Sequence, residues 1–261
     1  MCLSLKILYA IFLVVLAFGF MPLAAFSTVS AASTLVAVDA YTSGWVVNGF
    51  GAIATGILNH AANVLVLVFV SSRDCCRLMQ VDSVTIGDVP ATFLQGSLVR
   101  VGNWCKGEEM CQIEVWYAYL TAAGSDQVSV NWVDPNLEWA GFLAVSFTNA
   151  DPSHPIEDVS TSYAVSSTYA SVYVPAGSPH RLIVQFAYFD QPLQVDYYGG
   201  LANIVPGPNQ TLITDFTNHD TIMAAAGPPS MGGSVDVILS HTMLLPAFWE
   251  TVALGIRQVG T

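Results

Sequence analysis

Six short apolar segments, each closed by a turn, dominate the middle of the 261-residue chain. Segments of this length and spacing are typical of the strands of a β-sandwich, so we expect an all-β fold, a single antiparallel jelly-roll-like β-sandwich. The run VLVLVFV is apolar at both odd and even positions, which predicts a strand buried on both faces. The segments are NVLVLVFVSS (63–72), SVTIGDVPATF (83–93), CQIEVWYAYL (111–120), QVSVNWVDP (127–135), WAGFLAVSFTNADPSHPI (139–156) and RLIVQFAYFD (181–190).

The first 31 residues have the pattern of a secretory signal peptide. Lys6 precedes an apolar run from Ile7 to Phe20, and Val29-Ser30-Ala31 supplies small residues at the cleavage positions. A retained membrane anchor is the alternative reading of the apolar run. We expect residues 1–31 to be removed, leaving a secreted protein with no membrane span and one β-sandwich domain over residues 32–261.

The composition narrows the range of partners. The formal net charge is -12, charged residues make up 10% of the chain, and hydrophobic residues make up 53%. After the signal peptide, Lys106 is the only lysine, so no basic patch can neutralise several phosphates. The sequence therefore predicts no nucleic-acid partner, and the polar surface is expected to rely on Ser, Thr, Asn and Gln.

The cysteines indicate an oxidising compartment. Removal of the signal peptide takes away Cys2 and leaves Cys75, Cys76, Cys105 and Cys111. An even number of cysteines in a secreted protein predicts disulfide bonds. Because adjacent cysteines seldom bond each other, we expect each member of the 75–76 pair to bond one of the other two, with the connectivity open. A four-thiolate zinc site is the less favoured alternative.

The order of the segments carries a resemblance to a known group of proteins. The segments concerned are NVLVLVFVSS, VDSVTIGDVPATF, IEVWYAYL, VSVNW, AVSFTNADPSHPIEDV, the VPAG turn, LIVQFAYF, GGSVDVILSH and FWETVALGIR. In this order they resemble secreted jelly-roll domains of the concanavalin A-like lectin and glucanase type, found in bacterial and archaeal surface proteins. The chain is also similar in plan to β-rich archaeal extracellular filament subunits, which share strands between neighbours. The cysteine loop and the scarcity of lysine depart from the usual pattern.

Candidate catalytic groups are sparse. Glu108-Glu109 and Glu157-Asp158 are the nearest approach to a carboxylate pair, and both are expected in solvated loops. The glucanase-type signature is missing, because Glu114 is followed by Val-Trp-Tyr; this glutamate is expected to face solvent or to pair with Arg100. The five histidines are scattered singly, without the spacing of a metal or catalytic triad. These observations favour a protein that is not an enzyme.

Calcium is the metal that suits an acidic extracellular sandwich best, and no other cofactor is expected. Asp134, Asn136 and Glu138 lie at alternate positions of one turn, and Asp151 lies in a second acidic turn. Neither turn has the spacing of a known calcium loop, so calcium stays an open alternative.

Two tryptophans and one asparagine are candidates for surface roles. Trp104, in the cysteine loop, and Trp139, after the DPNLE turn, are the better candidates for an exposed sugar-binding ring, whereas Trp116 and Trp132 are expected to pack in the core or on a sheet face. Asn209 begins the only N-glycosylation sequon and follows a Pro-Gly-Pro turn.

Together these features predict a non-enzymatic extracellular structural or adhesive protein of the cell surface. In the sharper version the protein self-associates into filaments, and an N-terminal strand such as TLVAVDAY (34–41) or VVNGFGAIATGI (46–57) completes the sheet of a neighbour. The simpler alternative keeps that strand at the edge of its own sheet. A carbohydrate-binding module is the second hypothesis, and a glycan hydrolase or lyase is the third.

Overall fold

A computed structural model describes residues 35–47, 53–74, 79–102, 110–134, 137–175, 181–190, 205–206, 210–218, 220–226 and 237–260. The chain divides into two compact units, Met1–Thr34 and Leu35–Thr261. The first unit contains the predicted signal peptide and lies outside the described residues, so the fold below is that of the second. Within the described ranges every regular element is a strand and the sheets are antiparallel, which confirms the all-β class.

A central sheet organises the fold. Within the described ranges it has six strands in the order β1-β10-β3-β8-β6, with β7 also paired to β8. The bounds are β1 (Ala37–Val47), β3 (Val64–Asp74), β6 (Thr92–Phe93), β7 (Val99–Gly102), β8 (Met110–Leu120) and β10 (Trp139–Thr148). Strand β3 pairs with β10 on one side and with β8 on the other along almost its whole length. The edges of the central sheet are therefore β1 on one side and the short β6 and β7 on the other.

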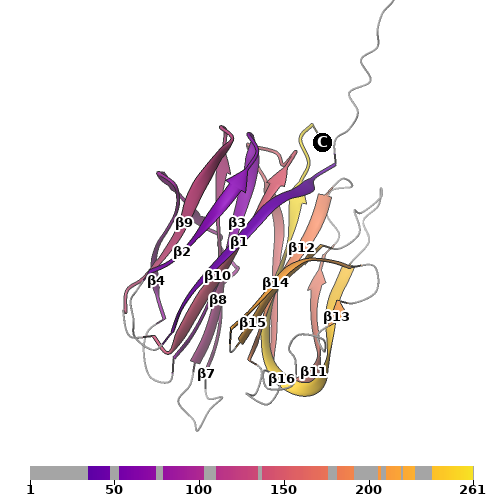
Figure 1. Cartoon of the computed structure of the whole chain (residues 1–261). Coiled ribbons are helices and arrows are strands. Elements are labelled where there is room, and N and C mark those ends of the chain that lie inside the picture. The colour runs from indigo at the N-terminus through magenta and orange to yellow at the C-terminus, as the bar shows by residue number, and fades with distance from the viewer. Residues whose placement is uncertain are drawn as a thin grey trace, which may run out of the picture. The chain divides into compact units, whose positions relative to one another are not determined.

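Two further sheets flank the central one. The minor flanking sheet has the order β2-β9-β4-β5, and the major flanking sheet has the order β11-β16-β12-β15-β14 with β13 beside β16. The minor sheet contains β2 (Ile53–His60), β4 (Val81–Ile86), β5 (Val89–Pro90) and β9 (Gly124–Trp132). The major sheet contains β11 (Ile156–Val174), β12 (Arg181–Asp190), β13 (Val205–Pro206), β14 (Thr211–Asn218), β15 (Asp220–Ala226) and β16 (Val237–Arg257). Figure 1 shows the three layers side by side.

Both faces of the central sheet are buried. Leu65, Leu67 and Phe69 of β3 belong to a core shared with the major flanking sheet. The alternate residues Val66 and Val68 belong to a second core, shared with the minor flanking sheet. Successive side chains of a strand point to opposite faces, so a strand in the middle layer needs apolar residues at every position. The prediction of a strand buried on both faces is confirmed.

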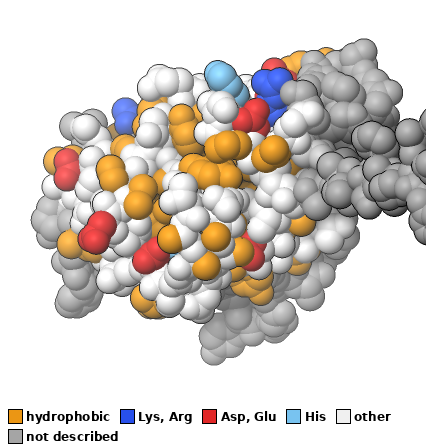
Figure 2. Space-filling view, turned by 90° about the horizontal axis from the view of Figure 1, so that it is seen from above, with side chains coloured by type: hydrophobic (Ala, Val, Ile, Leu, Met, Phe, Trp, Pro, Cys, Tyr) orange, Lys and Arg blue, Asp and Glu red, His pale blue; other side chains and the backbone are white. Residues whose placement is uncertain are grey.

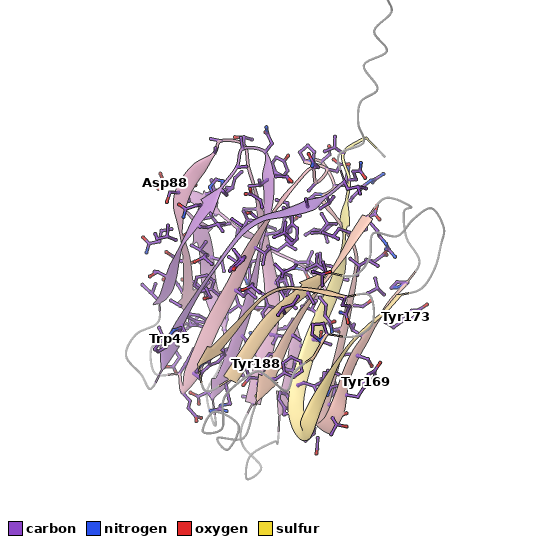
Figure 3. All side chains as sticks on the ribbon, turned by 45° about the vertical axis from the view of Figure 1, so that its right-hand side comes forward. Trp45, Asp88, Tyr169, Tyr173 and Tyr188 are labelled. Atoms are coloured by element: carbon purple, nitrogen blue, oxygen red, sulfur yellow. The ribbon has the colours of Figure 1, made fainter. Side chains whose placement is uncertain are left out.

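Aromatic packing joins the central and major flanking sheets. The rings of Phe69 and Phe186 stack with their centroids 5.4 Å apart, and those of Trp139 and Tyr188 lie 5.7 Å apart. Tyr188 also meets the edge of the Phe248 ring. Each of these side chains is buried, which stabilises the fold by about 2 kcal/mol or more per large ring. Figure 3 places Tyr188 between the sheets.

The two longest strands bend together at a corner. Strand β11 has three register shifts against β16, and between Tyr169 and Ser167 the partner on β16 moves from Thr242 to Ala247. The five-residue step on β16 contains Pro246, which cannot donate to the ladder. Beyond the corner, two valines of β11 pack on Ile183 and Ala253, on the face of the major sheet turned away from the central sheet; they are Val172 and Val174. The ribbon therefore folds back over its own sheet.

Candidate functional site

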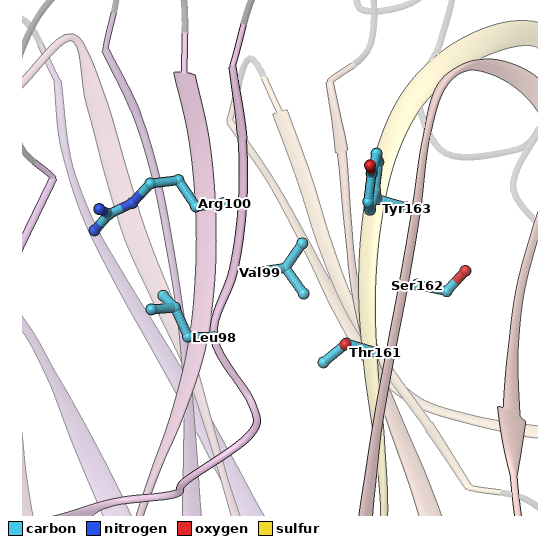
Figure 4. Close-up of a pocket in the computed structure, with 6 residues that line it drawn as sticks. All are labelled: Leu98, Val99, Arg100, Thr161, Ser162 and Tyr163. Carbon is cyan, nitrogen blue, oxygen red and sulfur yellow. The ribbon is translucent and has the colours of Figure 1, made fainter.

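An open hollow in the described surface lies between two sheet edges. A pocket of about 460 Å³ lies between β7 of the central sheet and β11 of the major flanking sheet, where the two layers diverge. The volume is in the range of pockets that hold small ligands. Figure 4 shows its lining residues, which are Leu98, Val99, Arg100, Thr161, Ser162 and Tyr163.

Three side chains give this pocket its chemistry. Val99 belongs to the core that faces the major sheet, so it points from β7 towards β11. Thr161 and Tyr163 are two residues apart in a regular stretch of β11 and leave the same face of the strand. Tyr163 is 55% exposed. The pocket therefore presents an apolar wall, a hydroxyl group and an open aromatic ring, and Figure 4 shows Arg100 turned away from β11.

A buried carboxyl group lies behind Tyr163. Glu250 of β16 is directly opposite Tyr163 on one side of the ladder and Tyr188 on the other. Its neighbours on the same strand face, Phe248 and Val252, belong to the core between the central and major sheets, so the Glu250 carboxyl points into that core. Among the described residues neither oxygen has a hydrogen-bond partner, and burial raises the pKa of Glu250 well above its usual range. The carboxyl therefore keeps its proton to a higher pH than an exposed glutamate does.

A second buried carboxyl lies on the opposite face of the central sheet. Glu114 of β8 is 7% exposed and accepts hydrogen bonds from the Trp116 indole at 3.2 Å and from the Gln112 amide at 3.4 Å. The Arg100 guanidinium donates to the Gln112 oxygen at 2.9 and 2.5 Å, so arginine and glutamate are joined through the glutamine. Burial outweighs these partners and raises the pKa of Glu114 to about 7. The expectation that Glu114 faces solvent is wrong, and its association with Arg100 is indirect.

The candidate sugar-binding tryptophans fare differently. Trp139 is 1% exposed and packs in the core on Tyr188, so the expectation of an exposed ring is wrong. Trp139 is the first residue of β10 and points inward, where Gly141 leaves room for the indole: a Cβ at that glycine would lie 3.2 Å from it. Trp104 lies outside the described residues. Trp132, expected in the core, is 3% exposed, as predicted.

Sequence reasoning missed two exposed aromatic residues on β1. Tyr41 is 56% exposed and Trp45 is 48% exposed. They are four residues apart in a stretch that pairs regularly with β10, so both rings lie on the same face of the edge strand. Figure 3 places Trp45 at the outside of the molecule. The alternation in AYTSGWV contains this signal. Ser43 lies between Tyr41 and Trp45 on the same face of the strand, and Gly44 lies on the other face, so the two rings are the large side chains of their face.

The residues proposed for calcium are divided between two places. Asp134 and Glu138 precede β10 and Asp151 follows it, so they are separated by the length of a ten-residue strand, roughly 30 Å. The Glu138 carboxylate accepts a hydrogen bond from Arg73 at 3.3 Å. The Asp151 carboxylate accepts from the backbone of Ser153 at 2.8 Å, which lowers the pKa of Asp151. Asn136 lies outside the described residues.

The Glu157-Asp158 pair lies within β11, so the expectation of a loop is wrong. Glu157 lies 3.5 Å from Arg257, and Asp158 forms an ion pair with the buried Arg181. Asp158 has a positive φ of 43° at the first register shift of β11, which identifies it as the bulged residue. These carboxylates therefore hold the start of β11 against its neighbours.

The disulfide and glycosylation predictions fall mostly outside the described residues. The described residues do not include Cys75, Cys76, Cys105 or Asn209. They do include Cys111, which is buried on β8. Asp74, at the end of β3, and Met110, at the start of β8, are opposite each other in the ladder, and each is next in sequence to a cysteine. The two disulfides stay a prediction.

Comparisons of the chain with protein-family models, with curated proteins and with solved structures found no match. In the described part of the chain no helix is long and apolar enough to cross a lipid bilayer. The same residues contain no cluster of three or more His, Cys, Asp or Glu side chains placed to hold a metal ion. What the protein does has to be argued from the geometry of its surfaces and pocket.

Proposed function

We propose that the chain is a non-enzymatic structural or adhesive protein of the cell exterior that associates with further copies of itself through its N-terminal edge strand. One observation carries this proposal. Strand β1 has no charged side chain from Ala40 to Val47, pairs regularly with β10 on one side, and has no hydrogen-bonded strand on its other side within the described residues.

An edge of this kind is unusual in a soluble protein. Native sheets protect their edges with charges, prolines, bulges or very short strands. The edge strand β5 ends in Pro90 and has two residues, and the edge strand β11 has three register shifts. Beyond its single irregularity at Asp39, β1 has none of these devices and exposes Tyr41 and Trp45. An unprotected edge with exposed aromatic residues is suited to pairing with another strand.

Charge allows a second copy as the partner at this edge. The chain carries a net charge of -12, so most approaches between two copies are repulsive. The uncharged stretch of β1 lets two copies pair without opposing carboxylates. Figure 2 shows one face of the molecule, where apolar side chains lie among uncharged atoms and basic groups are few.

The mode of pairing has two forms. In the structure β1 lies in its own sheet, as the simpler alternative predicts. A second copy then adds its β1 to the free edge. In the exchange form, β1 leaves β10 and is replaced by the β1 of a neighbour, as in the filament subunits to which the sequence bears a likeness. The likeness to lectin- and glucanase-type jelly rolls belongs to the same proposal and adds a secreted, surface-bound setting.

Sedimentation of the purified protein, produced from the full-length gene, tests self-association. We expect assemblies larger than a monomer, which electron microscopy resolves as dimers or fibres. Trp45→Lys places a charge on the free edge and is expected to leave a folded monomer. Val89→Lys is the matched control, because Val89 is 39% exposed on β5, an edge strand of a different sheet, the minor flanking sheet. A monomeric wild-type protein, or equal loss of assembly in both variants, contradicts the proposal.

An engineered disulfide separates the two forms. Thr42 and Ala144 are directly opposite each other on β1 and β10, at a spacing that a disulfide can bridge. The double variant Thr42→Cys, Ala144→Cys locks β1 into its own sheet when it is oxidised. Loss of assembly on oxidation identifies exchange, and retention of assembly identifies addition at the free edge.

A further inference from the structure

The pocket between β7 and β11 has a function of its own: we propose that it is a binding site for a neutral sugar ring, with Tyr163 as the stacking surface and Thr161 as a hydrogen-bonding group. The proposal goes beyond self-association and does not rest on it, because all the residues concerned belong to one copy of the chain.

The exposed ring of Tyr163 sets the class of ligand. A sugar ring has an apolar face of C–H groups that packs on an aromatic ring, and hydroxyl groups around its rim. Tyr163 is 55% exposed and forms one wall of the pocket, and the Thr161 hydroxyl leaves the same face of β11. Val99 supplies an apolar contact on the opposite wall. A volume of about 460 Å³ is sufficient for one or two sugar rings.

The charges around the pocket exclude an anionic ligand. Arg100 is the one basic residue in the lining, and its guanidinium donates two hydrogen bonds to Gln112 on the other face of the central sheet. A phosphate or carboxylate in the pocket therefore meets no available cation. The lining therefore favours a neutral ligand.

Binding of defined sugars tests the proposal. The probes are hexasaccharides of glucose, mannose, xylose and galactose, with choline as a cationic probe, and binding is measured by calorimetry at millimolar concentrations. We expect at least one hexasaccharide to bind and Tyr163→Ala to weaken that binding by about tenfold. Tyr169→Ala is the matched control: Tyr169 is 49% exposed on the same strand, beyond the corner, and its loss is expected to leave binding unchanged.

Two variants of Thr161 distinguish a binding role from a structural one. Thr161→Val removes the hydroxyl group, keeps the shape of the side chain and is expected to weaken sugar binding by about fivefold. Thr161→Ser keeps the hydroxyl group and is expected to retain binding. Failure of the wild-type protein to bind any hexasaccharide, binding of choline alone, or equal effects of Tyr163→Ala and Tyr169→Ala overturns the proposal. None of these results depends on whether the protein self-associates.

Discussion

Replacing Glu250 by glutamine should make the protein more stable at neutral pH. The carboxyl is fully buried, has no hydrogen-bond partner among the described residues, and has a pKa raised well above the ordinary value of 4.5 by burial alone. Glutamine has nearly the same shape as the protonated acid and does not ionise. We therefore expect Glu250→Gln to match the wild-type protein at pH 4.5 and to exceed it as the pH rises.

The magnitude follows from proton linkage. Above pH 4.5 the unfolded chain loses the Glu250 proton while the folded chain keeps it, so the folded state binds more protons and the free energy of unfolding falls as the pH rises. The slope approaches about 1.4 kcal/mol per pH unit between pH 4.5 and the pKa of the folded state. Glu114 adds a loss of the same sign between pH 4.5 and its folded-state pKa of about 7.

Urea unfolding at several pH values between 4.5 and 7 measures these slopes. The wild-type protein is expected to lose stability most steeply, Glu250→Gln less steeply, and the double variant with Glu114→Gln least. Glu157→Gln is the control, because Glu157 is partly buried beside Arg257 and its loss is expected to destabilise the fold slightly. Equal slopes for the wild-type protein and Glu250→Gln would show that Glu250 is ionised or partnered in the folded state, and would refute the reasoning.

Three further substitutions test the packing. Gly44→Ala is expected to destabilise the fold by about 2 kcal/mol in a urea titration, because its Cβ would lie 2.6 Å from the Thr55 carbonyl oxygen where β1 passes β2. Gly124→Ala is the control and should destabilise the fold less, because its Cβ would meet the end of a side chain at 3.3 Å. Asp158→Asn removes the carboxylate beside the buried Arg181 guanidinium and should cost about 2 kcal/mol, a value reduced for the partial exposure of Asp158 and measurable as a lower thermal midpoint. Trp139→Ala should cost about 4 kcal/mol in unfolding free energy; a loss below 1 kcal/mol would contradict its burial.

The fold class was accessible from the sequence because it depends on local alternation. The run at Val64–Val70 has apolar residues at every position, and only a strand in a middle layer requires that. The prediction that Trp139 is exposed was wrong for a related reason. It follows a turn, which suggested exposure, but it shares its parity with Leu143, Val145 and Phe147 of β10, which face the core. Parity along a strand was the better guide than distance from a turn.

The pocket could not be predicted from the sequence, because it depends on contacts between distant segments. Tyr163 and Glu250 are brought together by the pairing of β11 with β16, and Val99 reaches them from another sheet. No local pattern contains that register. One partial signal was present: in FWETVALG, Glu250 has the same parity as Phe248, Val252 and Leu254, so a glutamate stands in a row of core residues.

The register itself decides whether this glutamate is buried. A shift of one residue along β16 moves every side chain to the other face of the sheet. It would place Thr251 in the core and Glu250 on the face that carries Trp249 and Ala253. The register is held at the start of β11 by Asp158, the bulged residue whose carboxylate meets Arg181. The ion pair at the start of β11 therefore contributes to the register that places Glu250 opposite Tyr163.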